Sequence, residues 1–102
     1  MYGVIVQAKV DRGRAAEMRA MLATQVVPRA EQLPGFASGS WLQALDSDDG
    51  FAVMVFDSQE TALGFAERVV AQGPLADAPV WSVKGIGPFE VLARAEPRAA
   101  AG

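Results

Sequence analysis

The chain of 102 residues contains no cysteine and no histidine. The absence of cysteine excludes a disulfide framework, a thiolate ligand and a thiol nucleophile. The absence of histidine removes the usual partner of a catalytic serine and the side chain most often used as a general base or metal ligand. Serine-based acyl transfer therefore has no support in this sequence.

The sequence also has no long hydrophobic run and no dense stretch of positive charge. Its formal net charge is −3, with lysine and arginine scattered along the chain, so it lacks the basic stripe that nucleic-acid binding requires. No stretch reaches the roughly 18 to 20 apolar residues of a transmembrane helix, and residues 1–6 are too short for the core of a signal peptide. We expect a cytoplasmic protein, with no nucleic-acid or membrane partner.

What is present is a regular alternation of strand and helix patterns in a chain with 51% hydrophobic residues. We expect a single domain over residues 1–95 and a disordered tail over 96–102. Apolar residues alternate in the first strand, and helical spacing follows it. The predicted strands are 2–10, 36–45, 51–56 and an extended region 80–93, and the predicted helices are 14–31 and 59–72, with a loop at 75–79.

Local signals set the expected boundaries. Asp11 is placed to cap the first helix, and Pro28 should kink or end it. Asp57 and Ser58 are alternative caps for the second helix, and with Asp57 the residue Glu60 would complete a capping box. Gly50 closes a polar hairpin connection where a positive φ is expected. Residues 85–88, Gly-Ile-Gly-Pro, should bulge or break the last strand.

This order predicts an α+β, ferredoxin-like βαββαβ fold with a four-stranded antiparallel sheet and two helices on one face. The strands at 36–45 and 51–56 are apolar on both sides, with Trp41 beside Leu42 and Val53 beside Met54. Exposing such a face would leave more apolar area in water than monomers usually tolerate. We therefore expect a homodimer, an α+β barrel formed through the sheet faces.

Three short segments share a pattern with a known family: Pro-Gly-Phe at 34–36, Phe-Asp-Ser at 56–58 followed by Glu60, and Phe-Glu-Val-Leu at 89–92. On these residues the chain, from Val4 to Ala93, resembles the antibiotic biosynthesis monooxygenase-like (ABM) family of dimeric α+β barrels. That family includes cofactor-independent oxygenases of polycyclic phenols, haem-degrading enzymes, small-molecule isomerases and members with no known reaction. The shared segments are fold signatures and carry no catalytic group.

The haem-degrading branch of the family departs from this chain at the residues that matter. Where those members carry a strand asparagine, this sequence has Val6, and where they carry a helical tryptophan it has Phe65. Their iron-ligating histidine would fall near Gly73 or Pro74, and this chain has no histidine. Tyr2, the single tyrosine, could ligate iron in another arrangement, but a lone tyrosine at this position is usually an ordinary strand residue. We expect no cofactor and no metal.

The resemblance favours a cofactor-independent, monooxygenase-like enzyme that acts on a small aromatic or apolar substrate between the sheet and the helices. In such chemistry the substrate itself reduces oxygen, while the protein binds, desolvates and helps deprotonate it. The Asn, Trp and Tyr set of phenol-oxidising members is not reproduced, because the chain has no asparagine. The alternative is a noncatalytic dimeric barrel that binds a hydrophobic metabolite or retains no activity, so enzyme status stays open.

A pocket for such a substrate needs apolar and aromatic walls with a few polar groups. The predicted substrate-binding residues are Tyr2, Trp41, Met54, Phe65 and Trp81. Further polar candidates are Gln7, Lys9, Gln43 and Arg94. Each has a structural alternative: the tryptophans as core or interface anchors, the methionine as core, and the lysine as an exposed or ion-paired strand residue.

Two other patterns carry no function. Asp46, Asp48 and Asp49 before Gly50 lack the remaining ligands of a calcium loop and read as a hairpin turn. The glycines at 85 and 87 lack the third glycine and the following helix of a dinucleotide fingerprint. Catalytic residues are not identified by the sequence.

Overall fold

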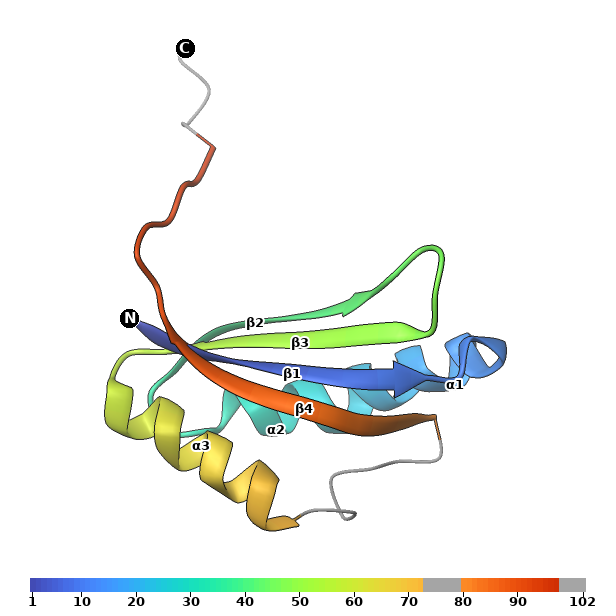
Figure 1. Cartoon of the computed structure of the whole chain (residues 1–102), viewed down its shortest axis with the longest axis horizontal. Coiled ribbons are helices and arrows are strands. Elements are labelled where there is room, and N and C mark those ends of the chain that lie inside the picture. Colours follow the sequence, from blue (N-terminus) through green and yellow to red (C-terminus); the bar gives the residue numbers. More distant parts are fainter. Residues whose placement is uncertain (73–79, 98–102) are drawn as a thin grey trace.

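The computed structural model describes residues 1–72 and 80–97, so the loop predicted at 75–79 and the tail from residue 98 lie outside the described residues. The four strands form one antiparallel sheet in the order β2-β3-β1-β4, with the helices on one side (Figure 1). The predicted α+β, ferredoxin-like class is confirmed. The elements are β1 (Tyr2–Val10), the 3₁₀ turn η1 (Arg12–Arg14), α1 (Ala15–Met21), the π-helix η2 (Leu22–Val26), α2 (Val27–Glu31), β2 (Phe36–Gln43), β3 (Asp49–Phe56), α3 (Gln59–Gln72) and β4 (Trp81–Glu90).

The first helical segment, from η1 to α2, begins at the predicted cap, but its first regular part ends at Met21, before Pro28, and α2 continues through Pro28 to Glu31. The side chain of Asp11 accepts a hydrogen bond from the Gly13 amide at 3.0 Å. The Val27 amide bonds back to the Leu22 carbonyl in the π register, and Pro28, which has no amide hydrogen, follows at once. The irregularity predicted at Pro28 is thus a π-helical turn that ends just before it.

The corner between α2 and β2 depends on Gly35, the one residue with positive φ in the described ranges, at +73°. The Asp57 amide donates to the Gly35 carbonyl at 2.9 Å, which ties this corner to the start of α3. A Cβ at position 35 would lie 2.5 Å from Asp57 Oδ1 and 2.7 Å from Thr61 Oγ1. Both the conformation and the space therefore require glycine here.

Two local expectations are resolved by these contacts. Ser58, rather than Asp57, caps α3, because its Oγ accepts a hydrogen bond from the Thr61 amide at 3.2 Å. The positive φ expected at Gly50 is wrong. Gly50 instead avoids a collision, since a Cβ there would lie 2.5 Å from Val10 Cγ2 on the neighbouring strand.

β4 contains the predicted bulge but not the predicted break. Gln7 pairs with Gly85 and Ala8 pairs with Val83, which leaves Lys84 as the extra residue. The strand then continues through Pro88, which lies opposite Val4. β4 is an edge strand of the described sheet, with β1 on one side. A proline there disrupts no second set of strand hydrogen bonds, because no further strand pairs with β4 among the described residues.

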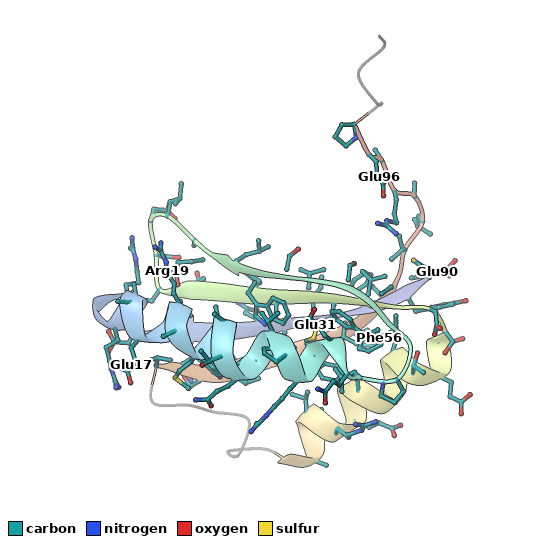
Figure 2. All side chains as sticks on the ribbon, turned by 180° about the vertical axis from the view of Figure 1, so that it is seen from behind. Glu17, Arg19, Glu31, Phe56, Glu90 and Glu96 are labelled. Carbon is teal, nitrogen blue, oxygen red and sulfur yellow. The ribbon has the colours of Figure 1, made fainter. Side chains whose placement is uncertain are left out.

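The core lies at the end of the sheet where β1 begins. Val4 and Phe56 are completely buried, and the Phe56 ring meets Phe36 edge-on at 6.1 Å and Phe65 at 5.6 Å between centroids. Figure 2 shows Phe56 between the sheet and the helices. The buried cluster is Val4, Ala30, Met54, Phe56, Ala62 and Ala66.

No helix of the described residues lies on the opposite face of the sheet, which we call the open face (Figure 1). Alternation places the odd-numbered residues of β1 there, and Ile5 is 40% exposed while Val4 beside it is buried. Leu42 of β2 is 53% exposed on the same face. The two-sided apolar pattern predicted for β2 and β3 is therefore confirmed. The other apolar residues of the open face are Phe51, Val53, Val55 and Phe89.

Candidate functional site

A row of four apolar side chains crosses the helix-facing side of the sheet, one from each strand. Trp41 pairs with Ala52, Ala52 with Val6, and Val6 with Ile86, in the spatial order of the strands. All four are half-buried and pack against the margin of the core cluster. We call this set the Trp41 row. It is an apolar floor that is not fully covered, about 14 Å long at ordinary strand spacing.

The helical segment over this side of the sheet is loosely attached. α1 and η2 contribute none of the described residues of the core cluster or of the side chains packed against it. The predicted apolar stripe of this segment, Ala15, Met18, Leu22 and Val26, is half-buried throughout. α3, by contrast, inserts Ala62 and Ala66 into the core. The sheet is thus tightly covered by α2 and α3 and incompletely by α1 and η2.

An open groove begins at the β4 end of the Trp41 row. It has a volume of about 390 Å³, which lies within the size range of small-molecule sites. Ile86 belongs to both the row and the groove, and Glu67 is the one ionisable residue of the lining. The lining residues are Leu63, Ala66, Glu67, Val70, Ala71, Ile86 and Pro88.

Four of the five predicted binding residues come together on the helix-facing side. Met54 is buried in the core cluster, and Tyr2, Trp41 and Phe65 pack against it. The fifth, Trp81, does not join them, because it pairs with Val10 at the opposite end of β1. Only Trp41 also belongs to the incompletely covered row.

The further polar candidates separate into different regions. Gln7 and Lys9 lie on the open face with Ile5, and Arg94 is exposed beyond β4, where it bonds to Glu96 and Met1. Gln43 alone lies on the helix-facing side, since it pairs with Gly50, whose α-carbon faces the Val10 side chain. The helix-facing side therefore receives one of these four groups.

The Lys9 ammonium forms an ion pair with Asp49 Oδ1 at 2.7 Å on the open face. The hydrogen bond from Lys9 and a second one from Ser47 lower the pKa of Asp49, and the hydrogen bond to Asp49 raises the pKa of Lys9. Both shifts stabilise the charged forms. Lys9 is thus an ion-paired strand residue, the structural alternative, and is no poised base.

Ala52 and Ile86 were missed as site residues by the sequence reasoning, and Val6 entered it only as the residue at the position of the haem-degraders' asparagine. They are ordinary apolar strand residues, and nothing in their type marks a site. The signal lies in the pairing register, which puts two small side chains between Trp41 and Ile86. Register across nonadjacent strands cannot be read from one strand's alternation.

No protein-family model matches the chain, and no curated protein sequence matches it. Several solved structures, by contrast, are similar to this chain. MhuD of Mycobacterium tuberculosis, a heme-degrader with two hemes bound in its active site, aligns over 94% of this chain and 100% of its own, with 21% identity and a TM-score of 0.72.

Two Streptomyces proteins are similar as well. ActVA-Orf6 of Streptomyces coelicolor, a monooxygenase solved with the ligand Nanaomycin D, aligns over 94% of this chain and 91% of its own, with 15% identity and a TM-score of 0.63. SnoaB of Streptomyces nogalater, a cofactor-independent oxygenase, aligns over 96% and 98%, with 21% identity and a TM-score of 0.58. The chain therefore has the ABM-like fold, as its segments predicted.

The residues of this chain do not fit a haem. The centre of the Trp41 row consists of the aliphatic side chains of Val6 and Ala52, and Phe65 is engaged with the Phe56 ring. The chain has no histidine or cysteine, and its single tyrosine, Tyr2, lies two pleats from the row, between Phe56 and Glu90. No histidine, thiolate or tyrosine is thus available as an axial ligand beside the row, and Met54, the nearest thioether on β3, is buried in the core cluster.

Proposed function

We propose that the protein is a cofactor-independent, monooxygenase-like enzyme that acts on a small aromatic or apolar substrate lying on the Trp41 row. The fold it shares with SnoaB and ActVA-Orf6 supports the reaction class. The observation that carries the proposal is the row itself, an apolar floor left half-buried under a helical segment outside the core. The groove beside Ile86 offers the route of entry.

The residues of the row perform binding and desolvation. Trp41 supplies an aromatic face on which a planar substrate can stack, and Val6 and Ala52 leave room beside it. The phenol loses its proton to water before it enters the site, and the apolar surround strips water from the phenolate. One electron then passes from the phenolate to O2, which leaves a phenoxyl radical and superoxide held together in the site. In this scheme the substrate supplies the electron and the protein supplies the dry, oriented site.

The test is to fill the row. Ala52→Leu adds three carbons between Trp41 and Val6, and we expect it to weaken binding of 1-naphthol at least tenfold, because a filled floor cannot seat a ring. Equilibrium dialysis measures the binding, and an oxygen electrode measures uptake with a panel of polycyclic phenols in the presence of a chelator. Ala16→Leu, at an exposed position of α1, adds the same carbons away from the row.

The proposal requires that the wild-type protein and Ala16→Leu bind alike and consume oxygen with at least one phenol. Equal binding by wild type and Ala52→Leu would place the ligand elsewhere. Thermal unfolding of both variants checks that any loss comes from the site and not from the fold.

A second candidate function is a noncatalytic barrel that binds a hydrophobic metabolite. One observation favours it: the described residues include no buried charged or polar residue that could act as a base beside the row. The same experiment separates the two functions. Binding of naphthol that depends on Ala52, without oxygen uptake for any phenol, would support the binding protein over the enzyme.

We further propose that the protein works as a homodimer through the open face. Ile5 and Leu42 are 40% and 53% exposed there, among several half-buried apolar neighbours on β3. A second sheet packed at about 10 Å would remove these side chains from water. The face has no charge other than the paired Lys9 and Asp49 among its described residues of β1 and β3.

A further inference from the structure

Gln43 holds a buried oxygen that has no hydrogen-bond partner. Within residues 1–72 and 80–97, Gln43 Oε1 is the side-chain atom of this kind. The amide nitrogen of the same side chain is fully engaged, since Nε2 donates to the Ser47 carbonyl at 3.0 Å, the Ala44 carbonyl at 3.2 Å and the Asp49 carbonyl at 3.3 Å. The amide nitrogen of Gln43 is therefore hydrogen-bonded, and its amide oxygen has no partner.

The orientation of this amide is determined by its surroundings. Exchanging the oxygen and nitrogen would set an acceptor against three backbone carbonyls, which is repulsive. The orphan atom is thus an acceptor, and it is anchored to the β2–β3 turn by three contacts. A side chain held in this way cannot rotate to find another donor without giving up those bonds.

The orphan acceptor belongs to the neighbourhood of the Trp41 row. Gln43 lies two residues after Trp41 on the same face of β2, so it is one pleat further along the strand. The first helical segment meets the turn at this end of the sheet, where Arg12 Nη2 donates to the Leu45 carbonyl at 2.8 Å. α1 follows directly, and it is outside the core cluster. The oxygen is buried at this end of the sheet, so access for a ligand from the row requires a local displacement of the side chains that cover it.

A buried acceptor without a donor is unfavourable, and natural proteins keep few of them. A ligand that brings its own O–H or N–H group would remove this penalty and gain a hydrogen bond. A ligand of the same size without a donor would leave the penalty in place. Sites of this kind discriminate strongly for the polar group, because the alternative is an unpaired buried atom.

We propose that Gln43 Oε1 accepts a hydrogen bond from the ligand of the Trp41 row, and that Gln43 selects aromatic ligands bearing a hydroxyl or N–H donor over their ethers. This inference rests on the proposed function and adds the chemical group that the site recognises. A neutral amide oxygen accepts only from a protonated group and would repel a phenolate, so Gln43 orients a hydroxyl or N–H that stays protonated, distinct from the oxygen ionised before electron transfer, and is no general base.

The experiment compares 1-naphthol with 1-methoxynaphthalene, in which a methyl group replaces the hydroxyl hydrogen and so removes the donor. Equilibrium dialysis of the wild-type protein should show naphthol bound about tenfold more tightly, although the ether is the more hydrophobic molecule. Gln43→Met keeps the length of the side chain and removes the acceptor, so the ratio should fall to one or below. Gln59→Met makes the same exchange at an exposed position at the start of α3, and it should keep the wild-type ratio.

A second measurement uses the wild-type protein alone, in case Gln43→Met does not fold. In ¹⁵N-labelled protein the side-chain amide resonances of Gln43 should shift with naphthol and stay nearly unchanged with the ether. A wild-type ratio near one, a ratio that survives Gln43→Met, or an unmoved Gln43 resonance would overturn the inference. If neither ligand binds at all, the proposed function fails first, and that result is distinct from equal binding of both.

Discussion

The two faces of the sheet differ less in composition than in how they are covered. Both carry a phenylalanine from β3, Phe56 on the helix-facing side and Phe51 on the open face, yet Phe56 is fully buried while Leu42 beside Phe51 is half exposed. The helix-facing side is itself uneven, because Val4 is completely buried and Val6, two residues along the same strand, is not. Apolar character alone therefore does not identify the core.

The difference in cover divides the sheet into three regions, for which we propose different roles. The region around Val4 and Phe56 stabilises the fold, the Trp41 row is left available for a ligand, and the open face is left available for a second copy. α3 approaches the sheet closely through Ala62 and Ala66, whereas α1 adds no side chain to the core within the described residues. Incomplete covering is thus confined to particular elements.

The largest effect is expected from a charge on the open face. Val53→Arg should weaken dimerisation at least 100-fold, because an unpaired guanidinium would be buried between the two sheets. Analytical ultracentrifugation across a concentration series measures the dissociation constant. Leu45→Arg, in the turn at a residue that is 92% exposed, is the control and should leave it unchanged.

A wild-type protein that sediments as a monomer at micromolar concentration would contradict the proposal that the open face binds a second copy. The open face would then tolerate water, and the expected barrel would be wrong. Equal dissociation constants for wild type and Val53→Arg would place the interface on another surface.

The next effect compares two valines of one strand. Val4→Ala should lower the free energy of unfolding by about 2 to 3 kcal/mol, because it leaves a cavity in the core. Val6→Ala removes the same methyl groups from a half-buried position, and it should cost about 1 kcal/mol. Denaturant unfolding of both variants, analysed with a common m-value, checks the order. A larger loss for Val6→Ala would show that the Trp41 row is core after all.

The smallest effect belongs to the Lys9–Asp49 pair, whose side chains are 54% and 32% exposed. The lowered pKa of Asp49 means that its contribution is present above the ordinary carboxyl range and is lost as the pH falls through the lowered value. The raised pKa of Lys9 means that its contribution is lost only as the pH rises through the raised value, above the ordinary lysine range.

The difference in Tm between wild type and Lys9→Met should therefore be small, level between about pH 5 and pH 10, and absent at more acidic or more alkaline pH. Thermal scans at a series of pH values test this. A difference that persists at pH 2 would mean that the aliphatic part of Lys9, and not its charge, provides the effect. Lys9→Met leaves the Arg14–Glu17 ion pair of the first helical segment intact, so the contribution of that pair to Tm is the same in both proteins.

Local patterns predicted the fold because each depends on neighbouring residues. Alternation in residues 2–10 identified β1, and the residue type of Asp11 identified the cap of the helical segment that follows. The Trp41 row could not be predicted, because it depends on which residues of four strands lie opposite one another. The orphan oxygen of Gln43 depends on the path of the turn at residues 44–49, which no spacing rule specifies.

The strand order has a consequence for how the chain acquires its structure. β1 is synthesised first but lies inside the sheet, between β3 and the last strand, with Tyr2 paired to Glu90. Contacts this distant in sequence slow folding, because a long loop must close before they form. On the ribosome β1 stays unpaired until β3 and then β4 have emerged, and until then its unpaired backbone and apolar side chains are exposed to neighbouring chains. The sheet is thus completed only after β4 has emerged.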